Sequence, residues 1–479
     1  MKQEFHPEFI SRYEPLFNKE EFQTFLEYCI KPLKKSIRIN TSKISVKDFE
    51  KLAKKNNWKL DKISYLENWY NIELLDNSKL LWKSIESFSW LFYIQETSSM
   101  IPAIVLDPKK WDIILDMSAA PWSKTTQLAN LINNNWLIIA NDISGSRIKV
   151  LKSNINSQWS YSCCVSKLDG RDFWNYYYEC FDKILLDAPC SAEGSMRKDK
   201  FNWSLDIIDK LSTLQMKMIL SALLSLKVWW ELVYSTCTMT PEEDEKVVNF
   251  VLDNLWDFVE IVDWNIKWLK TTPWVTSWEW QELHPDCSKS KKIWPHHNDT
   301  EWFFIAKFRK KASIKTDFIK EYFPKKSQEK LIKSKELKIL HSQIKKRFNI
   351  NKSVFKNMSI IKKENSLTIR TYEANNFSNL PNIHNMWIPF WEIIDNNFLL
   401  NFYSAQIFWK YADKNIIILN KENSNKFINW LNLDLNKSEI NNSELWQVIV
   451  KYENIILWTS LLQKNNKLKN QVPRENIKM

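Results

Sequence analysis

The sequence predicts an α/β protein built on a doubly wound parallel sheet, with a small mixed region before it and a β-rich domain after it. Three observations support this prediction. Between about residues 86 and 308, short and nearly continuous apolar runs alternate with helical stretches, as buried parallel strands alternate with crossover helices. The 479 residues are more than one compact domain usually holds. A hydrophobic fraction of 44% and a charged fraction of 26% are typical of globular chains and exclude a mainly disordered one.

The predicted elements follow in chain order. Residues 1–85 alternate short apolar and charged stretches, which indicates a small accessory region, mixed α/β or helical. Within residues 86–308, four apolar runs are the predicted parallel strands: 112–117 (DIILDM), 136–142 (WLIIAND), 182–187 (DKILLD) and 231–235 (ELVYS). Residues 309–350 are expected to form a basic linker or helical segment. Residues 351–479 are expected to form a separate β-rich domain, with predicted strands at 415–419 (NIIIL) and 448–452 (VIVKY).

The positive charge is concentrated between the central region and the tail. Residues 307–371 contain 20 Lys and Arg against 5 Asp and Glu, while the rest of the chain is slightly acidic. Such a segment favours binding to a polyanion such as nucleic acid, although a solvated, lysine-rich linker would look the same. The apolar runs are too short to span a membrane, and seven cysteines without a CxxC pair fit neither a disulfide framework nor a zinc site. We therefore expect a cytoplasmic monomer that binds no membrane and no metal.

Glycine and tryptophan occur in abnormal numbers. The chain has 3 glycines and 26 tryptophans, whereas average usage predicts about 34 glycines for this length. Trp229-Trp230 falls where a tight turn leads into a strand, a place that favours glycine. Our hypothesis is that many of these tryptophans are glycines in the cell, because some bacteria read the UGA codon as glycine. The alternative is a protein truly rich in tryptophan, and Trp58 and Trp203 do lie in ordinary contexts for that residue.

A loop of small residues follows the first predicted strand, which ends at Asp116. The loop and the start of the next helical stretch comprise Ser118, Ala119, Ala120, Pro121, Trp122, Ser123 and Lys124. Small residues at such a turn let backbone N–H groups approach a ligand closely, although an indole at position 122 would fill that space. Asp142 ends the next strand, where a carboxylate can accept the ribose hydroxyls of a nucleoside. Taken alone, this pattern fits a nucleotide site and a purely structural turn equally well.

Two cysteines follow the ends of later strands. Cys190 comes after Asp187-Ala188-Pro189, and Cys237 comes after Ser235-Thr236. Either thiol considered alone reads as buried and inert. Both cysteines, however, lie on the side of the predicted sheet where ligands bind, and Asp187 is near one of them in sequence. A thiolate beside a carboxylic acid and a nucleoside cofactor indicates covalent attack on an electron-poor ring.

Six segments together resemble the RsmB/NOP family of RNA cytosine-5 methyltransferases: IQETSSM (94–100), DMSAAPWSKTTQLA (116–129), NDISGSR (141–147), DGR (169–171), LLDAPCSAEGSMRKD (185–199) and YSTCT (234–238). The resemblance extends from about residue 5 to about residue 308. PLKKSIRINTSKIS (32–45) and LFYIQETSSM (91–100) are similar to the F-type branch, which acts on 16S ribosomal RNA. MWIPFWEI (386–393) and LKNQVPREN (468–476) are more weakly similar to that branch's PUA-like RNA-binding tail.

The departures from the family pattern are of one kind. Family glycines stand at the positions of Trp122, Trp229-Trp230 and Trp302. The family also has glycine at the positions of the three glycines that remain here, which are Gly145, Gly170 and Gly194. In every one of these departures, tryptophan replaces glycine. Because the departures are all of this one kind, they favour recoding over decay of the gene.

The resemblance implies a Rossmann-like class I domain that uses S-adenosylmethionine to methylate carbon 5 of a cytosine in RNA. It implies that Cys237 is the nucleophile that adds to carbon 6, and that Cys190 assists product release. Asp187 would hydrogen-bond the base near N3 and stabilise the developing charge. Which cysteine attacks is not readable from the residues themselves, since related DNA enzymes use the Pro-Cys one.

By the same resemblance, S-adenosylmethionine would be held by residues 118–124, Asp142 and Asp187, with Asp169 next to the adenine. Lys124 would assist at the loop, and Arg197 and Lys198 would bind phosphate. His296-His297 is expected to be structural or to face RNA, because no third metal ligand stands at a suitable spacing in the sequence.

The expected partner is 16S ribosomal RNA or the small ribosomal subunit. Two alternatives stay open. The first keeps the chemistry and moves the substrate to tRNA, which close relatives modify. The second is a ribosome-assembly factor without catalysis, which would keep the fold and the basic surface.

Overall fold

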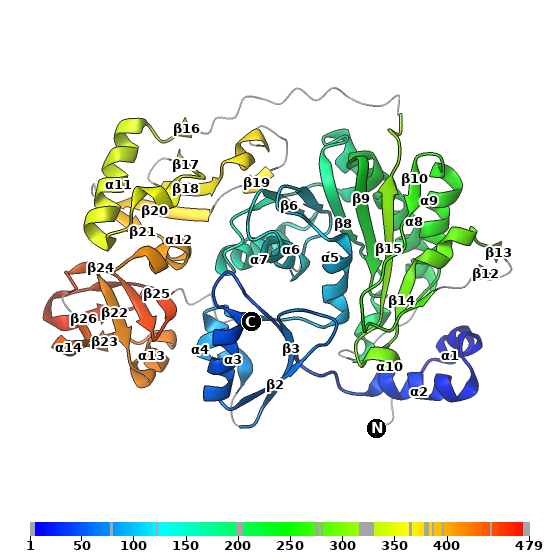
Figure 1. Ribbon diagram of the computed structural model, residues 1–479, viewed down its shortest axis with the longest axis horizontal. Coiled ribbons are helices and arrows are strands. Elements are labelled where there is room, and N and C mark those ends of the chain that lie inside the picture. Colours follow the sequence, from blue (N-terminus) through cyan, green and yellow to red (C-terminus); the bar gives the residue numbers. More distant parts are fainter. Residues whose placement is uncertain are drawn as a thin grey trace.

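The chain is described by a computed structural model over residues 5–76, 80–120, 123–197, 205–273, 277–278, 281–315, 330–363, 366–377, 383–385, 388–394, 397–440 and 443–472. Pro121, Trp122, Lys198 and Trp203 lie outside these ranges. Figure 1 shows the central sheet with the N-terminal region below it and the C-terminal region to its left. No helix in the described ranges has the length and apolar character needed to cross a membrane.

The central sheet is Rossmann-like, with a parallel middle and antiparallel edges. Its order is β11-β14-β15-β9-β8-β5-β6-β7-β19, and β10 also pairs with β15. The four predicted strands are confirmed and mutually parallel, while β15 pairs antiparallel with β9. The strands are β5 (Ile113–Asp116), β6 (Leu137–Asn141), β7 (Cys163–Ser166), β8 (Phe181–Asp187), β9 (Leu226–Thr236), β10 (Val259–Ile261), β11 (Thr272–Pro273), β14 (Lys291–Ile293), β15 (Phe303–Lys310) and β19 (Ile383–Asn385).

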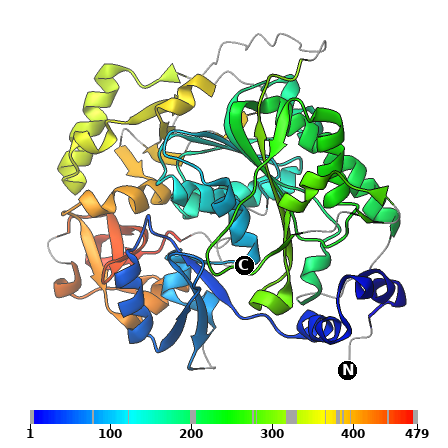
Figure 2. The same cartoon turned by 45° about the vertical axis from the view of Figure 1, so that its right-hand side comes forward.

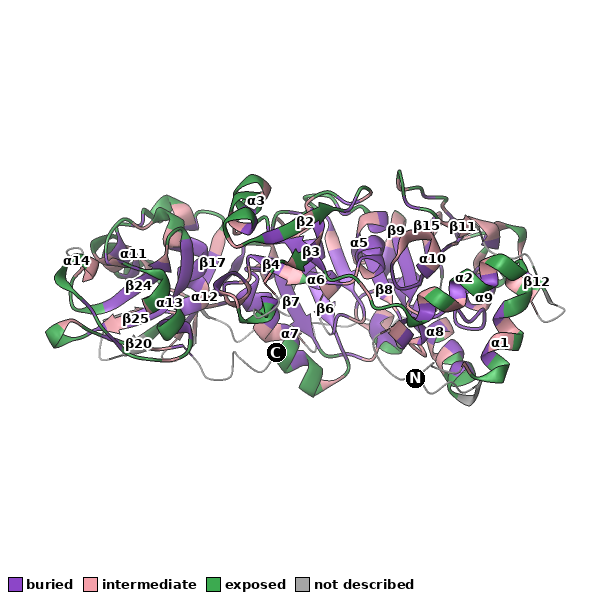
Figure 3. Cartoon of the chain, turned by 90° about the horizontal axis from the view of Figure 1, so that it is seen from below, coloured by how far each residue is buried: buried purple, intermediate pink, exposed green. Residues whose placement is uncertain are grey.

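Helices cover both faces of this sheet, so successive strand residues enter different cores. Ile114, Ile138 and Leu185 pack with one set of helices: α5 (Ile101–Leu106), α6 (Ser123–Leu131) and α7 (Gly145–Ser157). Their chain neighbours, including Leu115 and Leu186, pack with α8 (Leu205–Ser225) and α9 (Glu245–Leu255). Figure 3 shows the strands buried between the helical layers. Burial on both faces explains why the strands are nearly continuous apolar runs.

The N-terminal region has two parts. The first consists of α1 (Pro7–Tyr13) and α2 (Lys19–Ile30), which pack against the region of the central sheet (Figure 2). The second is an antiparallel sheet of order β2-β3-β1-β4 with two helices, which extends past the predicted boundary at residue 85. Its elements are β1 (Ser36–Ile39), α3 (Val46–Lys55), β2 (Trp58–Lys62), β3 (Trp69–Leu74), α4 (Ile85–Phe88) and β4 (Phe92–Ile94).

The C-terminal region is β-rich, as predicted, and contains two small sheets. The first comprises β16 (Lys330–Leu331), β17 (Met358–Lys363), β18 (Ser366–Thr371), β20 (Ile388–Ile394) and β21 (Asn397–Leu400). The second comprises β22 (Ile416–Leu419), β23 (Leu433–Asp434), β24 (Trp446–Tyr452), β25 (Ile455–Leu462) and β26 (Lys467–Lys469). The helices are α11 (Ser334–Phe348), α12 (Phe402–Phe408), α13 (Lys421–Ile428) and α14 (Lys437–Ile440). Residues 309–350 were expected to form a basic linker or helical segment, and α11 is helical. It packs through Leu340 and Ile344 into the core of the first sheet, so this helix is part of that fold.

Many tryptophans occupy backbone positions that favour glycine. Among the described residues, the left-handed region with φ between 50° and 95° contains Trp90, Trp136, Trp159, Trp229, Trp268, Trp430 and Trp446, and no glycine. At the end of α7, the Trp159 N–H donates to the carbonyl of Asn156 and the next N–H donates to Ile155. This is a Schellman motif, in which glycine is the usual left-handed residue. The same pair of bonds ends α4 at Trp90 and α13 at Trp430. These conformations support the recoding hypothesis.

Candidate active site

The loop after β5 lies at the edge where the parallel strands end. Ala119 and Ala120 are buried in this loop. The Ala119 N–H donates to the carbonyl of Asn141, at the end of β6, over 2.7 Å. This bond holds the loop against the neighbouring strand, and α6 begins shortly after it at Ser123. The loop of small side chains therefore lies at the edge of the sheet where ligands of such folds bind.

Asp116 ends β5 beneath this loop with its carboxyl group buried. Thr125 donates to Oδ2 over 2.6 Å, whereas Oδ1 has no hydrogen-bond partner among the described residues. Burial raises the pKa of Asp116 to about 7. A buried carboxyl oxygen without a partner is costly, so Asp116 is suited to accept a donor from a ligand in the loop.

The two predicted cysteines are in direct contact. Their Sγ atoms are 3.3 Å apart, and both side chains are partly buried. The contact with Cys237, together with burial, raises the pKa of Cys190 well above its ordinary value. A raised pKa favours the thiol form of Cys190, and its S–H can donate a hydrogen bond to the sulfur of Cys237.

Gly194 fixes the spacing between the two cysteine loops. Its N–H donates to the carbonyl of Cys237 over 2.7 Å. A Cβ atom at position 194 would lie 2.5 Å from that same carbonyl oxygen, which is closer than carbon and oxygen can approach. Only glycine therefore permits this contact between the segment after β8 and the end of β9.

Lys124 and Asp187 form an ion pair beside the cysteines. The Lys124 Nζ lies 2.7 Å from Oδ2 of Asp187, and Ser235 donates to Oδ1 over 2.9 Å. Burial opposes the charge on Lys124, yet the attraction of Asp187 leaves the pKa of the ammonium above its ordinary value.

Asp142 and Asp169 follow β6 and β7 at the same edge of the sheet. Asp142 is buried, accepts from the Ser144 N–H over 2.8 Å, and lies 3.4 Å from the Arg147 guanidinium. Asp169 is held by the side chain of Arg171, which lowers the pKa of its carboxyl group. Carboxylate oxygens at both positions are of the kind that accept hydrogen bonds from hydroxyl or amino groups.

Two buried glutamates that the sequence reasoning missed support the cysteine loops. Glu243 accepts from the Ser191 N–H, next to Cys190, and from Gln215, and burial raises the pKa of Glu243 to about 7. Glu193 accepts from the hydroxyl of Tyr13 on α1 and from the Met239 N–H. The run PEEDE at 241–245 was the available signal, but acidic runs are usually solvated and nothing in the sequence marks this one as buried.

Known proteins with similar sequences and structures belong to one group of methyltransferases. A family model described as 16S rRNA methyltransferase RsmB/F matches residues 103–309. A second, of the N-terminal domain of 16S rRNA methyltransferase RsmF, matches residues 5–97. A methyltransferase homolog from Pyrococcus horikoshii of known structure is 30% identical, with a TM-score of 0.55, and the match covers 100% of that chain and 64% of this one. The chain belongs to the RsmB/F methyltransferase family.

Two further relatives extend the comparison. The ribosomal RNA small subunit methyltransferase F of Shewanella sp. (strain MR-4) is 39% identical over 301 residues, which are 60% of this RsmB/F chain and 59% of the relative. The chain therefore matches about three fifths of the length of that curated relative. The NSun6 structure from Pyrococcus horikoshii, solved with SFG, is 26% identical with a TM-score of 0.54, covering 62% of this chain and 96% of that one.

In this RsmB/F chain, most predicted site residues lie at one edge of the sheet. Lys124, Asp187, Cys190 and Cys237 form one cluster, and the loop 118–120 with the carboxylates after β6 and β7 lies along the same strand ends. Pro121, Trp122 and Lys198 lie outside the described residues.

The expected phosphate contact of Arg197 does not fit the structure. Its side chain is 1% exposed and is already bound by Asp299 and by the carbonyls of Lys31 and Thr300. Arg197 therefore ties α2 to the segment before β15, and its guanidinium does not face solvent.

Proposed function

We propose that this protein transfers a methyl group from S-adenosylmethionine to carbon 5 of a cytosine in RNA, with 16S ribosomal RNA as the substrate. The observation that carries the proposal is the Cys190–Cys237 pair, 3.3 Å between sulfurs, beside the Lys124–Asp187 ion pair. One thiol with a raised pKa in contact with a second sulfur fits a reaction that needs both a thiolate and a proton carrier.

Each residue of the cluster has a defined step. Carbon 5 of cytosine is a poor nucleophile until the Cys237 thiolate adds to carbon 6, which places electron density on carbon 5. Asp187, held by Lys124 and Ser235, would hydrogen-bond the base near N3 as charge develops on the ring. Bound S-adenosylmethionine would supply the methyl group that carbon 5 takes, as the methyl–sulfonium bond breaks and S-adenosylhomocysteine leaves. Loss of the carbon 5 proton to a base expels the Cys237 thiolate, and Cys190 is placed to assist this release.

The residues present fit the cofactor. Asp142, after the end of β6, would accept the ribose hydroxyls, and Asp169, after β7, would lie beside the adenine. The Oδ1 of Asp116, which has no partner among the described residues, offers an acceptor under the loop. The NSun6 relative was solved with SFG, a S-adenosylmethionine analogue, which supports the assignment. The cofactor supplies an electrophilic methyl group on a sulfonium, and the protein supplies position and charge.

The basic segment is a suitable surface for the RNA backbone. Lys335, Lys338 and Lys345 are exposed on α11, three and seven residues apart, so they share one face of that helix. Such a row neutralises phosphates without reading sequence. The target base would leave its stack to reach the cysteines. The N-terminal family match and the curated relative favour 16S RNA over tRNA.

The test is transfer of labelled methyl groups to small ribosomal subunits that lack the modification, with Cys237→Ala as the inactive control. We expect label in 5-methylcytosine of 16S RNA for the unaltered chain and none for the control. Label on tRNA alone would retain the chemistry and replace the substrate. Cofactor binding without label on any RNA would favour an assembly factor.

A second measurement assigns the cysteines. Cys190→Ala should accumulate a covalent protein–RNA complex that survives denaturation, because Cys237 still attacks while release is impaired. If Cys237→Ala accumulated that complex, the two roles would be exchanged.

A further inference from the structure

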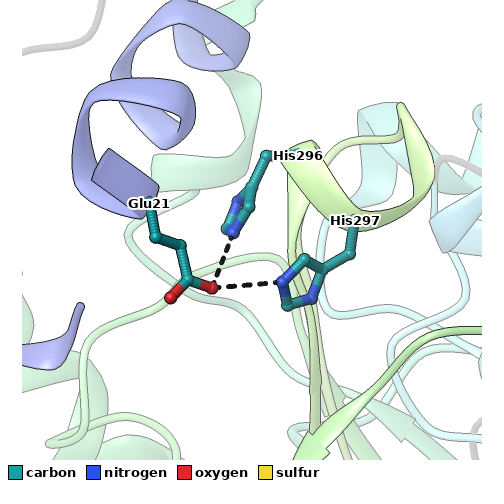
Figure 4. Close-up of side chains that lie close together, drawn as sticks. All are labelled: Glu21, His296 and His297. Carbon is teal, nitrogen blue, oxygen red and sulfur yellow. Dashed lines mark hydrogen bonds and ion pairs between the residues drawn. The ribbon is translucent and has the colours of Figure 1, made fainter. Parts of the chain in front are cut away.

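Three potential metal ligands converge at the contact between α2 and α10 (Pro295–Asn298). Glu21 lies on α2, and His296 and His297 are adjacent on α10. Figure 4 shows both imidazole rings directed at the same carboxylate oxygen. The Oε1 of Glu21 is 3.3 Å from Nε2 of His296 and 3.3 Å from Nε2 of His297. The sequence alone offered no third ligand for this histidine pair, because Glu21 is 275 residues from His296.

The distances fit a shared cation better than direct hydrogen bonds. Nitrogen–oxygen hydrogen bonds are usually about 2.9–3.0 Å long. A tetrahedral zinc ion with bonds of about 2.0–2.1 Å separates its ligand atoms by roughly 3.3–3.4 Å. The three ligand atoms here all lie within 4.8 Å of one another. A small movement of the side chains would bring the two histidine nitrogens to the separation that a tetrahedral ion needs.

The His296 ring is buried, while the other two side chains reach solvent. The His296 side chain is 4% exposed and is packed edge-on by the rings of Phe17 and Phe25. His297 and Glu21 are partly exposed, at 22% and 36% of their side chains, which leaves a path for an ion and for water.

We infer that Glu21, His296 and His297 form a binding site for one divalent transition-metal ion, with Zn²⁺ the best match to two imidazoles and one carboxylate. Water completes the coordination. The ion fastens α2 to α10, the short helix that precedes β15. Since β15 pairs with β9, which ends at Thr236 next to Cys237, the site anchors the N-terminal helices beside the central sheet. This inference does not depend on the proposed methylation.

The experiment uses untagged, full-length protein that has been stripped with a chelator and titrated with Zn²⁺, and separately with Co²⁺ as a spectroscopic probe. We expect one tightly bound ion per chain and visible Co²⁺ bands of the intensity that low coordination gives. Glu21→Gln and His297→Asn should each weaken binding at least tenfold, as losing a direct ligand does. Glu20→Gln is the matched control, because Glu20 is the exposed neighbour of Glu21 on α2.

Two additions keep the result decisive. The titration is repeated with Cys190 and Cys237 both changed to Ser, so that a thiol site cannot be mistaken for this one. The melting temperature is measured with and without Zn²⁺, and it should rise for the unaltered chain and for Glu20→Gln but not for Glu21→Gln. Absence of stoichiometric binding in the unaltered chain, or equal binding by Glu21→Gln and Glu20→Gln, would overturn the site and leave only hydrogen bonds.

Discussion

Three tryptophans occupy the left-handed position that follows a helix, and in each case the hydrogen bonds of a Schellman motif hold them there. A residue with a Cβ atom resists this conformation by about 1–2 kcal/mol. Gly145, Gly170 and Gly194, the glycines that the chain retains, all have ordinary φ values. The backbone therefore favours glycine at these three tryptophan positions. Gly170 and Gly194, in contrast, are constrained by close contacts and not by φ.

Trp229 offers a direct test of this residue-scale conflict. Its φ is 73° and its side chain is 70% exposed, so little packing is lost on substitution. Trp229→Gly should raise the free energy of unfolding by about 1 kcal/mol, by relief of left-handed strain. Trp82→Gly is the control, because Trp82 is 49% exposed but lies within a helical turn, where glycine should lower that energy by about 1 kcal/mol. Urea denaturation compares the two; equal losses would contradict the argument.

The same conflict predicts what the gene and the native protein contain. We expect UGA codons at positions 90, 159 and 430, and peptides from the native cells that carry glycine there. Sequencing of the gene and peptide mass spectrometry check this. A UGG codon at these positions would reject recoding and leave a chain that tolerates the strain.

Asp116 makes stability depend on pH. Its pKa in the folded state is about 7, against about 3.9 in an unfolded chain. Below pH 4 the carboxyl is protonated in both states; as the pH rises to 7, the unfolded state ionises first and the folded state loses relative stability. Asp116→Asn should remove this loss. Urea denaturation at pH 5 and pH 8 measures the free energy of unfolding of both proteins. From pH 5 to pH 8, the free energy of unfolding of Asp116→Asn should rise relative to that of the unaltered chain by a few kcal/mol. An identical pH dependence of the two proteins would refute the raised pKa of Asp116.

At the scale of elements, the site depends on how closely two loops approach. The segment after β8 and the end of β9 are joined by the Gly194–Cys237 hydrogen bond and by the contact of the two sulfurs. The loops also rest on Glu193 and Glu243, which are buried acids. The two sulfurs are thus held by backbone contacts and by the buried carboxyl groups of Glu193 and Glu243.

Gly194→Ala should separate these loops. The new Cβ atom would meet the Cys237 carbonyl at 2.5 Å, so the nucleophile must move, and a displacement of about 1 Å can reduce turnover about 100-fold. Gly145→Ala is the matched control, since a Cβ atom there meets its nearest neighbour at an ordinary 3.7 Å. Methyl-transfer rates and circular dichroism of both variants check the prediction. A Gly194→Ala enzyme as fast as the control would show that this spacing is not needed.

The parallel strands could be predicted because burial on both faces leaves an unbroken apolar run in the sequence. The positions of Asp187, Cys190 and Cys237 could be predicted because they follow such runs directly. The role of Glu243 could not, since its burial depends on Gln215 in α8 and on the backbone of another loop. Arg197 was placed wrongly for the same reason, because its partner Asp299 is distant in the sequence.

At the scale of the whole molecule, the N-terminal and C-terminal regions share one hydrophobic core. Ile37 and Phe49 of the first region belong to the same buried cluster as Ile417 and Val448 of the last. The Ser89 hydroxyl also donates to the carbonyl of Ile456. The apolar pattern identified both regions but carried no sign that they pack on each other, so the tail was expected to be a separate domain.

Removal of the tail should therefore damage more than RNA binding. A chain that ends at Lys311 exposes the apolar face of the N-terminal sheet, and we expect it to aggregate or to melt at a lower temperature. Replacing Lys335, Lys338 and Lys345 by Glu is the matched comparison, which should weaken RNA binding and leave the melting temperature unchanged. Light scattering and thermal melts measure both. A truncated chain that is monomeric and melts normally would contradict the shared core.

The pairing of β19 with β7 also determines when the central sheet can be completed during synthesis on the ribosome. Ser166 of β7 pairs with Ile383 of β19, so the β7 edge of the central sheet stays unpaired until β19 emerges from the ribosome. At 5–20 residues per second, that wait is roughly 10–40 s. During this interval the nascent chain presents an unpaired strand edge to its surroundings, and a chaperone or slow translation would have its greatest effect there.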